Sequence, residues 1–230
     1  MRKALTWTVA VLALLGAAYV GDTMLRGYVE NRVADAISAE FGESAGAPSV
    51  GLGGFPFMVS LITRSVPQAH IGVDTLPLEV SGHTVELANA VADTGEISLG
   101  ADTVSVATLT GSATLSYADL SRIADLPVTY AEDGRLQLRY EMDVFSSKIS
   151  LAVSALPDLD VDKQVIGLTD PKFNVNGDPI DVGVTQEQLD ALVKPIPVKL
   201  DHGLLLTSIT PREDGVAVGV EGTNLTLPIP

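Results

Sequence analysis

The stretch GGFPFMVSLITRS, residues 53–65, separates two kinds of sequence pattern. An apolar segment and a segment with helical periodicity precede it, and after it apolar residues recur mainly at every second position. Its glycine pair allows a tight turn, and the residue before its proline is restricted to extended conformations. Phe55 and Phe57 would share one side of such an extended segment, while residues 58–62 suit a strand or a short helix equally. We predict that this stretch joins a helix to a long sheet.

Length and composition set the first limits. The chain has 230 residues, of which 46% are hydrophobic and 5% aromatic, so its core must be aliphatic. That length accommodates one large domain or two small ones. The net charge of −15 disfavours contact with nucleic acid and with anionic membrane surfaces, so any contact with lipid would have to be apolar. The chain contains no cysteine, which excludes disulfides and thiolate metal sites.

Residues 1–21 have the pattern of a signal peptide or a signal anchor. Arg2 and Lys3 precede an uncharged run over residues 4–20, which is at the short limit for a membrane-spanning helix. The cleavage site is weakly formed, so the cleaved and the anchored forms both stay open. Since positive residues remain on the cytoplasmic side, we expect residues 22–230 to lie outside the cytoplasmic membrane, in a periplasm-like cell envelope, either anchored there or released.

Residues 22–42 show the periodicity of an amphipathic helix that ends at a glycine. The apolar stripe includes Leu25, Val29, Val33 and Ile37, and acidic and other polar residues occupy the opposite face. We expect this helix to pack on the sheet. The alternative is a helix lying on the membrane surface, but such helices normally have a basic polar face, which this one lacks.

From about residue 66 onward, alternating apolar and polar residues separated by glycine turns predict a series of antiparallel strands. Two short helices interrupt the series, near residues 116–125 and 185–194, and each begins with a capping-box pattern. Both are followed by a Pro-Val pair, a glycine turn and a strand. This repeated order suggests an internal duplication, although capping boxes are common enough to recur by coincidence. The predicted fold class is α+β, with a long antiparallel sheet and few helices.

No pattern of catalytic residues emerges. The sequence contains neither a nucleophile elbow, nor a phosphate-binding glycine loop, nor an HExxH motif. Asp158, Asp160 and Asp162 alternate like the start of a calcium loop, but Lys163 and Thr169 occupy the positions where that loop needs Gly and Glu. We therefore predict no catalytic residue, no metal, no cofactor and no enzyme activity. A hydrolase with an unmarked pair of carboxylates is kept as an alternative.

Five motifs, in this order, carry a family resemblance: GFPF, SYADL, DGRLQL, HGLLLTSIT and EDGVAVGVEGTNLTL. With the basic-hydrophobic N-terminus and the amphipathic helix before them, the chain resembles the DUF2993 family of actinobacterial, LmeA-like cell-envelope proteins. The resemblance covers roughly residues 22–228 and implies a single lipid-binding domain over 22–230. It implies binding of phospholipids, including phosphoinositides, and support of lipomannan-type glycolipid synthesis. It also implies a fold like the tubular, BPI-like lipid-binding proteins, in which a long curved sheet wraps a long helix.

An apolar pocket for lipid is the predicted site, with the Gly-Gly-Phe-Pro-Phe turn, residues 53–57, at its mouth. The residues expected to line it are Phe55, Phe57, Leu61, Ile62, Leu25, Val29, Val33 and Ile37. The cations expected to hold an anionic headgroup are Arg64, Arg122, Arg135 and Arg139. In the alternative interpretation the two phenylalanine rings only close the end of the core, as aromatic residues usually do.

The expected partners are a phospholipid or lipid-linked glycan, the cytoplasmic membrane through residues 4–20, and an envelope mannosyltransferase. Nucleic acid is not expected as a partner. In a second hypothesis the chain is an adaptor that binds an envelope glycosyltransferase and holds no lipid.

Overall fold

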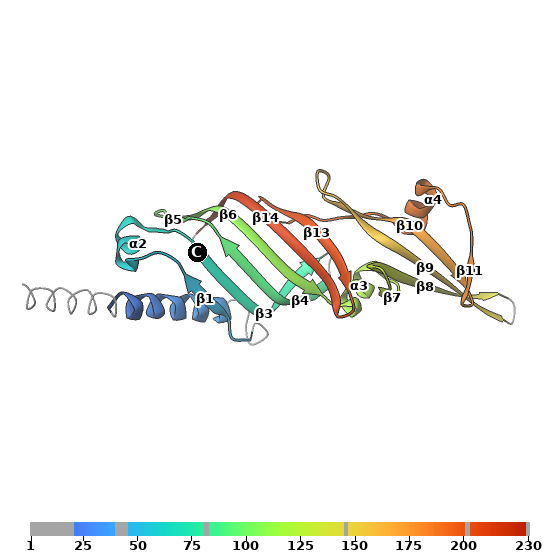
Figure 1. The fold of residues 1–230 in the computed structure, drawn as a ribbon, viewed down its shortest axis with the longest axis horizontal. Helices are drawn as coiled ribbons and strands as arrows, with labels where there is room; N and C mark the ends of the chain where they lie inside the picture. Colours follow the sequence, from blue (N-terminus) through green and yellow to red (C-terminus); the bar gives the residue numbers. More distant parts are fainter. Residues whose placement is uncertain (1–20, 40–45, 81–82, 145–146, 201–202, 229–230) are drawn as a thin grey trace, which may run out of the picture.

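The computed structural model describes residues 21–39, 46–80, 83–144, 147–200 and 203–228. These residues form two antiparallel sheets, one after the other along the long axis of an elongated molecule (Figure 1). An N-terminal helix spans residues 21–39. Within the described ranges no helix is both long enough and apolar enough to cross a bilayer, and the predicted signal or anchor lies outside them except for its last residue. The shorter helices are α2 (Phe57–Thr63), α3 (Tyr117–Ala124) and α4 (Gln186–Leu192).

The eight-stranded sheet occupies the half of the molecule that contains the N-terminal helix (Figure 1). Its main strand order is β1-β3-β4-β6-β14-β13, and β5 pairs with both β6 and β2. β14 thus lies inside this sheet, between β6 and β13. The strands are β1 (Ser49–Leu52), β2 (Ser65–Val66), β3 (Ala69–Val80), β4 (His83–Thr94), β5 (Ile97–Leu99), β6 (Thr103–Leu115), β13 (Leu204–Arg212) and β14 (Gly215–Pro228).

The six-stranded sheet forms the other half, in the order β11-β10-β9-β8-β7 with β12 added to β10. On its strand β8, Leu136 and Leu138 are buried while Arg139 is exposed, which is the alternation that the sequence predicts. The strands are β7 (Val128–Ala131), β8 (Arg135–Val144), β9 (Ser147–Asp160), β10 (Val165–Val175), β11 (Asp178–Ile180) and β12 (Ile196–Pro197).

Both predicted short helices begin at their capping patterns. Ser116 caps α3, because its hydroxyl accepts a hydrogen bond from the backbone N–H of Asp119 at 3.1 Å. Thr185 and Gln188 form a complete capping box at the start of α4. The helices predicted near 116–125 and 185–194 are therefore confirmed.

The hydrophobic core lies where the two sheets meet. It consists of Val128, Leu136, Leu138, Ala155, Leu168, Leu189 and Val216, contributed by β7 to β10, α4 and β14. The hydroxyl of Tyr117 on α3 donates a hydrogen bond to the carbonyl of Arg212 at 2.6 Å. The side chain of Gln164 donates to the carbonyl of Leu206 at 3.0 Å and accepts from its N–H at 2.7 Å. These polar contacts join the two sheets around the core.

The N-terminal helix lies beside the edge of the eight-stranded sheet, next to β1 (Figure 1). The carboxylate of Glu30 accepts a hydrogen bond from the N–H of Leu52 at 2.7 Å, which satisfies a donor on the edge strand. The α+β class, the N-terminal helix and the antiparallel pairing are confirmed. The prediction of one curved sheet wrapped around this helix is wrong in two respects: the described strands form two sheets, and the helix flanks an edge strand.

Each of the short helices α3 and α4 is followed by a short strand and then by a longer one. The pairing of these strands differs, however. β7 and β8 pair with each other, whereas β12 pairs with β10 and β13 joins the other sheet. The internal duplication therefore stays a prediction.

Candidate functional site

One face of the eight-stranded sheet is mainly apolar, whereas the other is polar along the middle of β6 and carries the buried pair Val106 and Leu225 further along. Directly paired residues of antiparallel strands point to the same face, and the register pairs Ala113 on β6 with Val218 on β14. Thr110 and Ser112, which alternate with the apolar positions of β6, are exposed on the opposite face. We call the first surface the apolar face, and define it by Ile71, Val73, Leu76, Leu87, Ala92, Leu109, Ala113, Leu115, Val218 and Val220.

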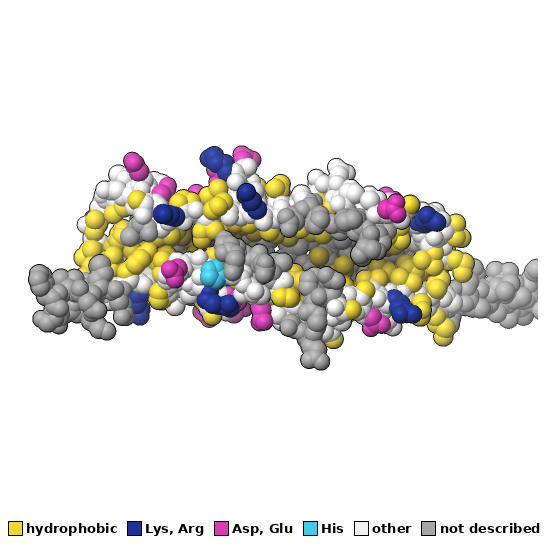
Figure 2. All heavy atoms as spheres, turned by 180° about the vertical axis from the view of Figure 1, so that it is seen from behind, with side chains coloured by type: hydrophobic (Ala, Val, Ile, Leu, Met, Phe, Trp, Pro, Cys, Tyr) yellow, Lys and Arg dark blue, Asp and Glu magenta, His cyan; other side chains and the backbone are white. Residues whose placement is uncertain are grey.

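The apolar face is only partly covered. Each of these ten residues retains some exposure, whereas the residues of the core between the sheets are at most 8% exposed. Ala69, Val85 and Val216 share this face by their pairing but are buried, so the uncovered part lies between them. Aliphatic side chains of a closed core are normally removed from water. Seen from behind, hydrophobic side chains form a band along the long axis, with charged side chains above and below it (Figure 2). The apolar face thus leaves an aliphatic surface available to a ligand.

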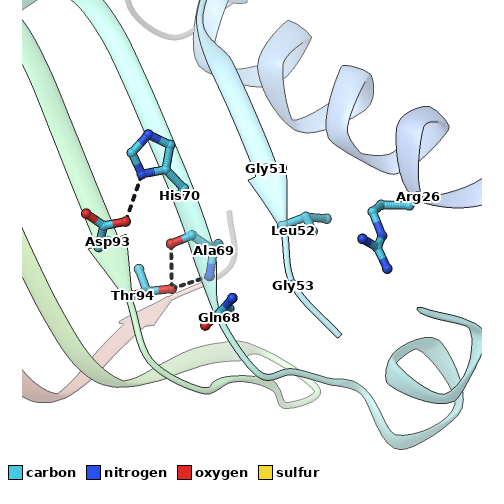
Figure 3. Close-up of a pocket in the computed structure, with 9 residues that line it drawn as sticks. All are labelled: Arg26, Gly51, Leu52, Gly53, Gln68, Ala69, His70, Asp93 and Thr94. Carbon is cyan, nitrogen blue, oxygen red and sulfur yellow. Dashed lines mark hydrogen bonds and ion pairs between the residues drawn. The ribbon is translucent and has the colours of Figure 1, made fainter. Parts of the chain in front are cut away.

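A cavity of about 420 Å³ lies between the N-terminal helix and the ends of β1, β3 and β4 (Figure 3). It adjoins the apolar face, because Thr94 lines the cavity and pairs with Leu109. Small-molecule sites are commonly this large and mix apolar walls with a few polar groups. The cavity is lined by Arg26, Gly51, Leu52, Gly53, Gln68, Ala69, His70, Asp93 and Thr94.

Two polar contacts organise the strand side of this cavity (Figure 3). The ring Nδ1 of His70 lies 2.7 Å from Oδ1 of Asp93, between β3 and β4. The N–H of Ala69 donates to the hydroxyl oxygen of Thr94 at 2.9 Å. The side chains of His70, Asp93 and Thr94 therefore already have polar partners, which leaves Arg26 on the helix side as the charge to consider.

Arg26 extends from the N-terminal helix toward the exit of β1 (Figure 3). Its guanidinium lies 3.6 Å from the Asp22 carboxylate, donates to the carbonyl of Gly54, and lies 5.7 Å from the centroid of the Phe57 ring. Its Nε is buried and has no hydrogen-bond partner among the described residues. Such a donor favours a ligand with acceptor oxygens, such as a phosphate. No motif in the sequence marks Arg26, and its spacing of four from Asp22 is the signal that the sequence offers for it.

The structure separates the two phenylalanines of the opening stretch. Phe57 begins α2 and is fully buried, whereas Phe55 is 67% exposed. The expectation that both rings share one side is therefore wrong, because the chain turns into a helix at Phe57. Leu61 and Ile62 lie on the exposed side of α2. The predicted stripe of the N-terminal helix is partly buried at all four positions, Leu25, Val29, Val33 and Ile37. Their contact with lipid stays a prediction.

The four arginines expected to hold a headgroup are spread over three parts of the fold. Arg64 follows α2, Arg122 belongs to α3, and the other two belong to β8 in the six-stranded sheet (Figure 1). Nearby aspartates form ion pairs with Arg122 and Arg135, while Arg64 and Arg139 are exposed. The four side chains thus do not converge on one place, and their role in headgroup binding stays a prediction.

The alternating aspartates at the end of β9 are engaged within the chain. Asp160 accepts hydrogen bonds from the backbone N–H and the side chain of Lys163, at 2.9 and 2.7 Å. These hydrogen bonds lower the pKa of the Asp160 carboxyl. In the part of the chain that the structure describes, no group of three or more His, Asp or Glu side chains is arranged to hold a metal ion.

A partly exposed aliphatic sheet face beside a cavity with a cation suits an amphiphilic, lipid-like ligand. A family model described as LmeA-like phospholipid-binding matches residues 20–221. The chain belongs to this family, as the sequence motifs predicted, and is a lipid-binding protein. A search of curated proteins and a search of solved structures found no match.

Proposed function

We propose that the apolar face binds the acyl chains of a phospholipid, and that the protein acts by holding this lipid rather than by catalysis. The observation that carries the proposal is the partial exposure of most of an aliphatic sheet face in a member of a phospholipid-binding family. Each methylene group removed from water contributes about 0.8 kcal/mol. Burial of even part of an acyl chain would therefore give net binding after the entropy that the lipid loses on binding is subtracted.

The cavity beside Arg26 is the proposed place of the headgroup. It adjoins the apolar face at Thr94 and Leu109, so one molecule would reach from the aliphatic strands into the polar cavity. Arg26 supplies the positive charge, and charge-assisted hydrogen bonds to phosphate are stronger than neutral ones. An anionic phospholipid is the proposed ligand, and the family resemblance extends this class to phosphoinositides.

The proposed location is the cell envelope outside the cytoplasmic membrane, with the protein either anchored or released after cleavage. The charge pattern and apolar run of residues 1–21 support this location. The family resemblance supports a role in presenting a phospholipid or a lipid-linked glycan to enzymes of lipomannan-type synthesis, a mannosyltransferase among them.

Native mass spectrometry of the purified chain, followed by extraction and identification of bound lipid, tests the proposed function. A co-purifying phospholipid supports it. A compact, lipid-free protein that captures an envelope glycosyltransferase would support the adaptor function instead. Turnover of envelope glycolipids that disappears when carboxylates are changed to amides would show a hydrolase.

Arg26→Gln tests the headgroup position. We expect it to lower the binding of phosphatidylglycerol several-fold while the binding of phosphatidylcholine changes little, and Arg26→Lys should retain part of the preference. Arg32→Gln is the matched control, since Arg32 is exposed on the same helix and contacts the hydroxyl of Tyr28 at 3.2 Å. An unchanged preference for the anionic lipid in a folded Arg26→Gln variant would place the headgroup elsewhere.

A further inference from the structure

An exposed apolar surface surrounds α2. Met58, Val59 and Leu61 are each at least 43% exposed, Ile62 is 77% exposed, and Phe55 just before the helix is 67% exposed. Single exposed apolar residues are common on proteins, but a contiguous group of them marks an interaction surface. We call these five residues the α2 surface.

The α2 surface lies beside the point where the N-terminal apolar segment joins the fold. The N–H of Met58 donates a hydrogen bond to Oδ1 of Asp22 at 3.0 Å, and Asp22 is buried. α2 occupies the end of the molecule at which the N-terminal helix begins (Figure 1). Residues 4–20 precede this helix directly and form an uncharged, largely apolar run. A membrane that takes up this run would therefore meet α2.

The charge around α2 also suits a lipid surface. Residues 44–73 contain no aspartate or glutamate, although the chain has 29 of them. Arg64 follows α2 and is exposed. A long cationic side chain in this position reaches lipid phosphates while its apolar neighbours enter the acyl layer. After residue 21, the longest segment without acidic residues thus coincides with the exposed apolar patch, in a chain of net charge −15.

We propose that the α2 surface inserts into the surface of a phospholipid bilayer, the same bilayer that residues 4–20 enter. Docking of this kind brings the cavity beside Arg26 close to the bilayer, because Arg26 bonds the carbonyl of Gly54, next to Phe55. On the proposed lipid-binding function, this is the end at which lipid enters or leaves the apolar face. The docking itself does not depend on that function.

Single-cysteine variants of the full chain test the docking, since the natural sequence has no cysteine. Ile62→Cys carries an environment-sensitive fluorophore on the α2 surface, and Val59→Cys provides a second label there. Ser112→Cys carries the same label on the exposed polar face of β6 and is the control. All three variants keep the same N-terminal segment and are reconstituted into phosphatidylcholine vesicles.

The emission of the labels at positions 62 and 59 should shift to the blue and be quenched by nitroxide groups on the lipid acyl chains. The emission at position 112 should change little. Labels on α2 that stay unquenched in vesicle-bound protein would overturn the proposal. A blue shift without vesicles that grows with protein concentration would also overturn it, and would assign the surface to a second copy of the chain. Native mass spectrometry of the same variants reports bound lipid separately, so failure of docking and failure of the lipid-binding function are distinguishable.

Discussion

Two leucine substitutions test whether the molecule is divided into a packed part and a ligand-binding part. Leu138 on β8 is 3% exposed and belongs to the core between the sheets. Leu109 on β6 belongs to the apolar face and is partly exposed. We expect Leu138→Ala to lower the stability of the protein and Leu109→Asp to lower its lipid binding.

The expected magnitudes follow from the burial of each side chain. Truncation of a buried leucine to alanine costs about 2–5 kcal/mol, and in a chain of this size each kcal/mol lowers the Tm by roughly 2–4 °C. Water reaches Leu109, so a carboxylate there keeps much of its hydration and should cost only about 1 kcal/mol. The same carboxylate would have to lose that hydration beneath an acyl chain. Lipid affinity should therefore fall by roughly tenfold or more, which corresponds to about 1.4 kcal/mol.

Chemical denaturation measures the stability of both variants, and native mass spectrometry measures their bound lipid. Ser112→Asp is the control, because it adds the same charge to the exposed polar face of the same strand. A loss of stability as large for Leu109→Asp as for Leu138→Ala, with lipid binding retained, would refute the reasoning. Leu109 would then belong to a closed core.

Three further sets of substitutions test individual contacts. Phe57→Ala should lower the free energy of unfolding by about 3–5 kcal/mol, because the ring is fully buried. Phe55→Ala should change it by less than about 0.5 kcal/mol in the absence of membranes, and chemical denaturation compares the two. Tyr117→Phe should cost about 1 kcal/mol for the lost hydrogen bond. Burial raises the pKa of Tyr117, so its contribution is complete below the ordinary tyrosine pKa and is lost as the pH rises through the folded-state pKa; denaturation curves of the variant across alkaline pH should lack this loss. Glu30→Ala should leave the edge-strand N–H of Leu52 without its acceptor and speed its hydrogen exchange. Unchanged exchange would show that the N-terminal helix does not protect this edge.

Local signals in the sequence were sufficient for the local structure. The caps at Ser116 and Thr185 are hydrogen bonds between residues three apart, so their pattern can be seen in the chain itself. The alternation around Leu136 and Leu138 reports a strand with one buried face for the same reason. The order of the motifs also sufficed to identify the family.

Long-range pairing was not predictable in this way. On one side β14 pairs with β13, which precedes it directly in the sequence, but on the other side it pairs with β6, which lies far earlier in the chain. No local pattern selects β6 as this partner. The division into two sheets follows from such long-range strand pairings. Arg135 likewise meets Asp170, a residue 35 positions away, and is buried by the fold. The cavity beside Arg26 is formed by segments that the sequence does not link, so its cation was not singled out.

Periodicity predicts that a strand has an apolar face, but it does not tell whether a second layer covers that face. The core between the sheets and the apolar face have similar aliphatic sequences. They differ in whether another layer of the protein packs against them, and that depends on the packing of segments distant in the sequence. An uncovered aliphatic face of this kind is therefore visible only as partial exposure in the folded structure.

The acidity of the chain bears on how the lipid would be selected. A net charge of −15 does not attract an anionic lipid from solution, so affinity must come from apolar burial and selectivity from a few sheltered cations. The Arg26 side chain is 27% exposed, and charges in such places are screened by salt much less than charges on the surface. We therefore expect the binding of anionic phospholipid to change little as the salt concentration rises from low to physiological values. A steep loss of binding would assign the headgroup to the exposed Arg64 or Arg139 instead.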